Sequence, residues 1–383
     1  MIFPVDNPNE ENPKPTALFA AAAGSATANS WTSINGWAAA RVYSAVSEEY
    51  EAAQSAAVIA DTGPIARYAV RGPGAADFLS RITSAPVSTL EIAESARGLI
   101  LDEEGAVIDI VETARLGRDL FLLTSSRPHA RRLQLAARGL DATCEDISGA
   151  ISALAIIGPD ARDVAAAAGF DASSETLAAQ GRVRGVETSV RPIHFGALSG
   201  VEIMYPHNEA LTLWERLRRV RAPLPIGLEA LEILRIEGGA PRPGLDFISA
   251  EHARDNELRR RPIEIGLDHL APTDCAWFNG RRALKAPSLP CRLLAVLAID
   301  ADAVPAGAAV LGRKGPVGRL TSLAFSPRLK RIVAFADLDP SALGAPLAVA
   351  RFGAEAEPVA ARFYETPESR LAGAFRAASA KRA

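Results

Sequence analysis

Residues 227–247 read GLEALEILRIEGGAPRPGLDF, and this stretch is the most informative part of the sequence about the fold. Leu231, Leu234 and Ile236 recur at a spacing that places apolar side chains on one side of a helix. The pair Gly238-Gly239 predicts the end of that helix, because glycine readily adopts the left-handed conformation that closes one. We therefore expect an amphipathic helix followed by an irregular loop.

The chain before this helix contains one local pattern twice. A short apolar strand, a Gly-Pro turn and an amphipathic helix are predicted at residues 68–82, and LAIIGPDARDVAAAA at residues 154–168 repeats them. This repetition indicates an internal duplication of an α+β unit. Strong helix formers also predict a helix over Ser47–Asp61, and hairpin strands are predicted at Leu99–Leu101, Val107–Ala114 and Leu120–Thr124.

The sequence pattern changes near Pro290, after which short strand-like runs alternate with Gly and Pro. Such spacing is typical of a small β-barrel or sandwich. The predicted domains are therefore a lead-in at 1–30, α+β parts at 31–150 and 151–288, and a β-domain with its tail at 289–383.

Composition and charge exclude several classes of protein. The 383 residues are 48% hydrophobic and 23% charged, which is typical of a folded globular chain. A net charge of −3 without a long basic run argues against a nucleic-acid partner. We expect no membrane segment, because no run of 18 apolar residues occurs and the first residues are polar and acidic. The chain has three cysteines and no CxxC, which argues against a disulfide framework and a structural metal site and favours the cytoplasm. No HExxH motif is present, which also argues against a metal site. The absence of a GxGxxG or P-loop motif argues against a nucleotide site.

Six blocks, in order and correctly spaced over roughly residues 37–370, resemble the folate-binding aminomethyltransferase (glycine-cleavage T-protein) family, in the variant found in dimethylglycine- and sarcosine-oxidising enzymes and folate-dependent demethylases. The blocks are GAVIDIV at 105–111, GVEI at 200–203, the helix and turn at 227–247, FNGRRAL at 278–284, GRLTSLAFSP at 318–327 and RFYETPESR at 362–370.

The resemblance implies an α+β fold in which two ferredoxin-like domains and a C-terminal β-barrel form a three-domain ring around a folate channel. It implies tetrahydrofolate as cofactor and transfer of a methyl or methylene group from a small methylated donor. Any oxidation would then require a separate oxidoreductase subunit. The alternative is a non-catalytic folate-binding, subunit or assembly protein of the same fold.

By the same resemblance, Glu202 is the carboxylate that accepts from the pterin ring amide and exocyclic amine. The competing interpretation is an ordinary strand glutamate that faces solvent or pairs with an arginine. Arg97 stands where the family has a tyrosine, and Tyr364 lies at the channel mouth or simply packs. Arg235 contacts the ligand or, on the competing interpretation, ties its helix to neighbouring parts of the chain.

The chain departs from the family at the hairpin, where Ile110 occupies the position of the catalytic aspartate. Asp109, one residue away, is a second catalytic candidate, but a regular strand places it on the opposite face, so it could substitute only through a bulge. Glu112 shares the face of Ile110, so we expect it to take over part of the catalytic role. A surface glutamate on a hairpin is the other interpretation of Glu112.

Overall fold

The computed structural model describes residues 11–174, 179–183, 185–274, 277–286, 290–351 and 358–364. These residues form two compact units. Unit 1 contains residues 1–100, 109–231 and 276–278, and unit 2 contains residues 101–108, 232–275 and 279–383. The first ten residues of the lead-in predicted at 1–30, and the motif end at 365–370, lie outside the described residues.

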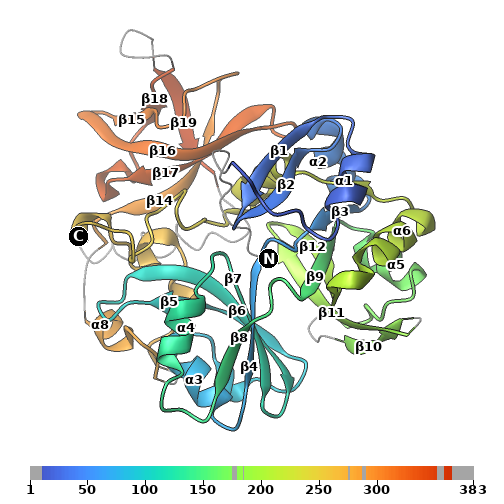
Figure 1. Ribbon diagram of the computed structural model, residues 1–383. Helices are drawn as coiled ribbons and strands as arrows, with labels where there is room; N and C mark the ends of the chain where they lie inside the picture. Colours follow the sequence, from blue (N-terminus) through green and yellow to red (C-terminus); the bar gives the residue numbers. More distant parts are fainter. Residues whose placement is uncertain are drawn as a thin grey trace. The chain divides into compact units, whose positions relative to one another are not determined.

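A five-stranded sheet in the first half of the chain has the order β5-β6-β7-β4-β8 (Figure 1). Helices α3 (Ala75–Ile82) and α4 (Ala130–Ala136) pack against it. The predicted hairpin strands are confirmed, but β5 begins four residues before the predicted limit, β6 ends three residues after it and β7 one residue after it. The strands are β4 (Ala66–Arg71), β5 (Ser95–Leu101), β6 (Val107–Gly117), β7 (Leu120–Ser125) and β8 (Thr143–Asp146).

A six-stranded sheet follows, with the order β10-β11-β12-β9-β3-β13. Helices α5 (Ala161–Ala167) and α6 (Ala210–Val220) cover one face of it (Figure 1). The core under these helices includes Ile156, Ile203 and Trp214. The strands are β3 (Val58–Asp61), β9 (Ile151–Ile157), β10 (Ala179–Val183), β11 (Val186–Phe195), β12 (Leu198–Pro206) and β13 (Leu224–Pro225).

The two sheets repeat one topology. The order β5-β6-β7-β4-β8 corresponds to β10-β11-β12-β9-β13, with β3 inserted before the last strand. Each repeat begins with a strand, a Gly-Pro turn and a helix, as predicted. The turn glycines Gly72 and Gly158 have φ of +115° and +128°, and a Cβ on Gly158 would lie 2.4 Å from the carbonyl oxygen of Ala56. Only glycine fits such a turn, because both the dihedral angle and the close approach exclude a side chain.

The helix predicted over Ser47–Asp61 is correct only in its first part. Helix α2 spans Val46–Ser55, and the chain then forms strand β3, which the prediction missed. Val58 and Ile59 are fully buried, and β3 pairs with β9 on one side and β13 on the other. Burial of β-branched side chains inside a sheet has outweighed the helix propensity of the alanines around them.

The two sheets of unit 1 face each other, and part of the space between them is apolar. Ala114 on β6, Leu122 on β7, Ala153 on β9 and Met204 on β12 form one buried cluster. Side chains alternate along a strand, so residues two positions from Ala114 and Met204 point into the same space. Those residues are Glu112 and Glu202.

Unit 2 contains a closed barrel with the order β14-β17-β16-β15-β18-β19, which confirms the predicted C-terminal β-barrel. Its core includes Leu297, Val310 and Ala336. The division of the chain between the units falls within helix α7 (Leu228–Gly238), after Leu231. The helix ends as predicted, with Gly239 at φ +73°. The barrel strands are β14 (Leu293–Ile299), β15 (Ala309–Gly312), β16 (Gly315–Ser326), β17 (Arg331–Leu338), β18 (Leu347–Val349) and β19 (Val359–Phe363).

The remaining elements are short. The N-terminal part contains a two-stranded sheet and one helix of unit 1, and a helix of unit 2 precedes the barrel. Their bounds are α1 (Phe19–Ser25), β1 (Ser30–Ile34), β2 (Trp37–Val42) and α8 (Arg281–Lys285).

Candidate functional site

Glu202 on β12 lies at the centre of a buried charged cluster in unit 1. Its side chain is fully buried and accepts from four donor groups. Oε1 accepts from the Thr62 hydroxyl at 2.7 Å and from Arg67 Nη2 at 2.8 Å. Oε2 accepts from Arg191 Nε at 2.7 Å and lies 2.6 Å from Arg191 Nη2. A carboxylate has about four lone-pair positions, so the protein itself already fills the acceptor capacity of Glu202.

Glu112 on β6 joins the same cluster from the opposite sheet. Its Oε1 accepts from Arg191 Nη1, and its side chain is 9% exposed. Ile110, two residues earlier on the same strand, is buried. Arg191 on β11 therefore bridges the two carboxylates that the sequence selected, and Glu112 is a buried ion-pair partner rather than a surface glutamate.

The charges of this cluster keep Glu202 ionised. Burial alone raises the pKa of its carboxyl, but the nearby guanidinium groups of Arg191 and Arg67 outweigh burial and lower the pKa to about 2. Burial lowers the pKa of Arg67. Burial also acts to lower the pKa of Arg191, but Glu112 and Glu202 raise it above its ordinary value. Two carboxylates and two guanidinium groups balance one another at neutral pH.

Asp109 lies on the other side of β6 from this cluster. It is fully buried, accepts from the Ser126 hydroxyl and lies 2.9 Å from Nε2 of His129. Its Oδ1 also accepts from the backbone N–H of Ile110 at 2.8 Å. The structure thus places Asp109 and Glu112 in separate environments, in agreement with the strand alternation expected from the sequence.

The other predicted cofactor residues are not part of this cluster. Arg97 lies on β5 in unit 1 and is half-buried. Arg235 and Tyr364 belong to unit 2. Tyr364 follows β19, where its backbone N–H donates to Val296 at 2.8 Å and its hydroxyl accepts from Arg328 at 3.2 Å.

Arg235 is held by acceptors within unit 2. Its Nε and Nη2 donate to the two carboxylate oxygens of Glu232, at 2.8 and 2.6 Å. Its Nη1 donates to Asp246 at 2.7 Å and to a backbone carbonyl at 2.5 Å, and Nη2 also donates to Ser322 at 2.9 Å. All five N–H groups therefore have acceptors in the protein. The bond to Ser322 joins helix α7 to barrel strand β16.

A cavity of about 540 Å³ continues the space between the two sheets beyond the charged cluster. Its walls include Leu116, Ser189 and Met204. Ser189 and Met204 are two residues from Arg191 and Glu202 on their strands, or about 7 Å along each strand. The cavity is wide enough for a bicyclic ring, and the charged cluster lies behind Met204.

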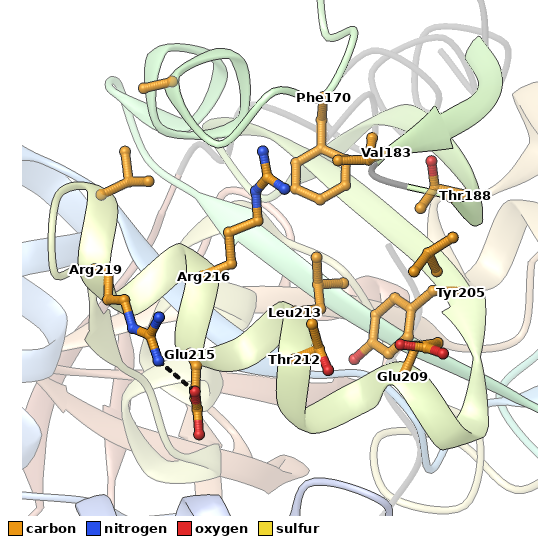
Figure 2. Close-up of a pocket in the computed structure, with 14 residues that line it drawn as sticks. Phe170, Val183, Thr188, Tyr205, Glu209, Thr212, Leu213, Glu215, Arg216 and Arg219 are labelled. Atoms are coloured by element: carbon orange, nitrogen blue, oxygen red, sulfur yellow. Dashed lines mark hydrogen bonds and ion pairs between the residues drawn. The ribbon is translucent and has the colours of Figure 1, made fainter.

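A second cavity, of about 740 Å³, lies on the opposite face of the six-stranded sheet (Figure 2). Phe170, Leu213 and Tyr205 line it together with Arg216, whose guanidinium carbon is 5.8 Å from the centre of the Phe170 ring. Arg219, also at its edge, pairs with Glu215. No residue predicted as a site residue lines this cavity.

Sequence reasoning missed Arg67, Arg191 and Thr62. Arg67 lies one residue before the strand predicted from residue 68, and Arg191 lies on a strand that none of the six blocks covers. A weak signal exists, because an arginine at the centre of an apolar strand is rarely buried without a carboxylate partner.

Other kinds of site are not evident within the part of the chain that the structure describes. No group of three or more His, Cys, Asp or Glu residues is arranged to hold a metal ion there. Among those same residues, no helix is both long and apolar enough to cross a membrane.

Comparison with known proteins identifies the family. The model of the GCVT N-terminal domain matches residues 21–264. A probable aminomethyltransferase from Haloarcula marismortui is 30% identical over 354 residues, covering 88% of this chain and 94% of the relative. An aminomethyltransferase from Streptomyces coelicolor is 27% identical, covering 81% and 86%. The crystal structure of glycine cleavage system aminomethyltransferase T from Bartonella henselae superposes with a TM-score of 0.81 at 22% identity, covering 94% and 98%. The fold is therefore that of the T-protein, and the chain belongs to the GCVT family of aminomethyltransferase relatives.

Proposed function

We propose that this chain is a tetrahydrofolate-dependent one-carbon transferase that takes a methyl or methylene group from a small methylated donor. The observation that carries the proposal is the fully buried Glu202, whose carboxyl is kept ionised inside a family whose named relatives are aminomethyltransferases. A buried carboxylate is suited to the ring amide and exocyclic amine of a pterin, because it accepts both N–H groups and fixes the ring.

The residues around Glu202 fit this cofactor only in part. The cavity lined by Met204 supports the proposal, since a volume of 540 Å³ accommodates a pteridine ring. The four donors already on Glu202 oppose direct binding. A pterin therefore reaches this carboxylate only by displacing donors that the protein itself supplies.

Within the proposal, Glu112 is the carboxylate that stabilises a cationic donor or takes a proton, and Ile110 supplies an apolar wall beside it. Asp109 supports the hairpin through Ser126 and His129. Arg235 holds helix α7 to the barrel, while Arg97 and Tyr364 are the remaining candidates for contacts to the folate.

A methyl group transferred at the methylene level must lose two electrons, so we include an oxidoreductase partner in the proposal. Free thiols at Cys144 and Cys291 suit the cytoplasm.

A second candidate is a folate-binding protein without catalysis. The specific observations in its favour are Ile110 at the position of the family's aspartate and the filled acceptor positions of Glu202. Both candidates predict folate binding, and only the first predicts turnover.

The test is incubation of the full chain with tetrahydrofolate and three donors, one methylated amine, one sulfonium and one methoxy-aromatic compound. Methyl- and methylene-tetrahydrofolate are then separated by chromatography, and reduced-folate binding is measured by calorimetry. Product formation that is lost in Glu112→Gln, with folate binding retained, supports the transferase. Binding without any product supports the second candidate, and absence of binding contradicts both.

A further inference from the structure

The 740 Å³ cavity of unit 1 plays no part in the proposed function. It lies over the edge strands of the six-stranded sheet, where β10 is the outermost strand and β11 its neighbour. Val186 and Thr188 on β11 line it, and they share the face of Val190, which belongs to the core under α5 and α6. Glu202 points to the other face of the sheet, because it is three residues from the lining residue Tyr205 on β12.

Most of the cavity wall is apolar. Helix α6 contributes Leu213 and Val220, the chain after α5 contributes Phe170, and the edge strands contribute Val183 and Val186. A cavity of this size with apolar walls and a few polar groups is typical of sites for small organic ligands. The apolar body of such a ligand therefore has a surface to pack on.

Arg216 on α6 is the cationic group beside this apolar wall. Its guanidinium carbon lies 5.8 Å from the centre of the Phe170 ring, and Figure 2 shows the two side chains next to each other. Gly169 leaves room for it, since a Cβ there would lie 2.7 Å from Nη2 of Arg216. A guanidinium packed on a ring still directs its N–H groups outward in its own plane. Because it carries five N–H donors, a carboxylate can bind beside the contacts that Arg216 already makes.

The other charged groups of the lining do not cancel this cation. Glu215 and Arg219 pair with each other at 2.6 Å, at the exposed edge (Figure 2). Glu209 precedes Arg216 by seven residues, which along a helix corresponds to about 10 Å. The end of the cavity that contains Phe170 and Arg216 therefore favours an anion.

We infer that this cavity is a second binding site, which takes a small monocarboxylate with an apolar body. The carboxylate binds Arg216, and the body packs on Phe170, Leu213 and Val186. Alkyl and aryl acids share this chemistry. The site is separate from the Glu202 cluster, so it does not rest on the proposed function.

The experiment measures the dissociation constants of hexanoate, 3-phenylpropionate and uncharged hexanamide by NMR titration of the full chain. We expect both acids to bind, and hexanoate to bind at least about tenfold more tightly than hexanamide, or about 1.4 kcal/mol. The tighter of the two acids identifies the preferred body as alkyl or aryl.

Arg216→Met keeps an apolar stem against Phe170 and removes the charge. We expect it to weaken hexanoate to the level of hexanamide and to leave hexanamide unchanged. Arg221→Gln is the matched control, because it changes the net charge equally and lies outside the lining, where Arg221 is 4.0 Å from Asp163. It should leave all three constants unchanged.

Thr212→Phe covers the case in which Arg216→Met does not fold, because Thr212 is an exposed lining residue of α6. The larger side chain fills the cavity, so we expect all three ligands to lose affinity. Equal affinities for hexanoate and hexanamide, an unchanged hexanoate constant in either variant, or no acid binding at about 10 mM would overturn the inference. Each of these results leaves the folate tests of the proposed function untouched, so the two proposals can fail separately.

Discussion

Replacement of Glu202 by glutamine tests the charge balance of the buried cluster directly. Glutamine keeps the shape of the side chain and mimics the protonated carboxyl. A carboxyl whose pKa falls from 4.5 to about 2 on folding contributes on the order of 3 kcal/mol to the free energy of unfolding at pH 7. Removal of one partner from a buried ion pair costs a similar amount, roughly 3–5 kcal/mol. We therefore expect Glu202→Gln to lower the stability of unit 1 by about 3 kcal/mol at pH 7.

The pH dependence of this difference gives the sharper test. Because folding lowers the pKa, the stabilisation is complete above pH 4.5 and is lost as the pH falls towards 2. The difference in the free energy of unfolding between the unaltered protein and Glu202→Gln should therefore disappear as the pH falls from 4.5 to 2. All four tryptophans, Trp31, Trp37, Trp214 and Trp277, belong to unit 1, so urea unfolding followed by tryptophan fluorescence reports on the unit that contains the cluster.

Glu145→Gln is the matched control, because Glu145 pairs with Arg71 at the surface, where their side chains are 67% and 52% exposed. An exposed pair of this kind contributes less than about 1 kcal/mol. The reasoning is refuted if Glu202→Gln loses less than about 1 kcal/mol at pH 7. A loss that stays constant down to pH 2 would refute it equally, since the effect would then not come from the charge of Glu202.

Two further substitutions test the packing of unit 1 by the same unfolding assay. Gly158→Ala should lower the free energy of unfolding by more than about 2 kcal/mol, because the position has a φ of +128° and an added Cβ would lie 2.4 Å from a carbonyl oxygen. Gly149→Ala is the control and should change the free energy of unfolding little, because nothing lies near its added Cβ. Equal losses in the two variants would contradict this account. Tyr205→Phe should stabilise the protein by about 1 kcal/mol, since the buried Tyr205 hydroxyl has no partner among the described residues. Tyr68→Phe should have the opposite sign, because the Tyr68 hydroxyl accepts from the backbone N–H of His129 at 2.6 Å, and a shared sign for the two would exclude hydrogen bonding as the cause.

Local patterns in the sequence determined most of the secondary structure. The Gly-Pro turns at Gly72 and Gly158, the end of α7 at Gly238 and the strands of the barrel all follow from short-range chemistry. Such features depend on the dihedral preferences of a few neighbouring residues, so they can be read without the rest of the chain. Strand β3 was missed because its pairing with β9 and β13 comes from residues about 100 and 165 positions further along the chain.

The sequence also selected Glu202 and Glu112 and placed Asp109 on the opposite face, since strand alternation is a local property. What the sequence by itself could not determine was the partner of each charge. The pairing of β11 with β12 places Arg191 directly opposite Glu202, whereas the packing of one sheet on the other brings Arg67 to Glu202 and Glu112 to Arg191. A buried charge is stable only beside its counter-charge, and the two contacts between the sheets join residues that are 79 and 135 positions apart. The tertiary structure alone therefore decided that these carboxylates are bound by arginines of the same chain.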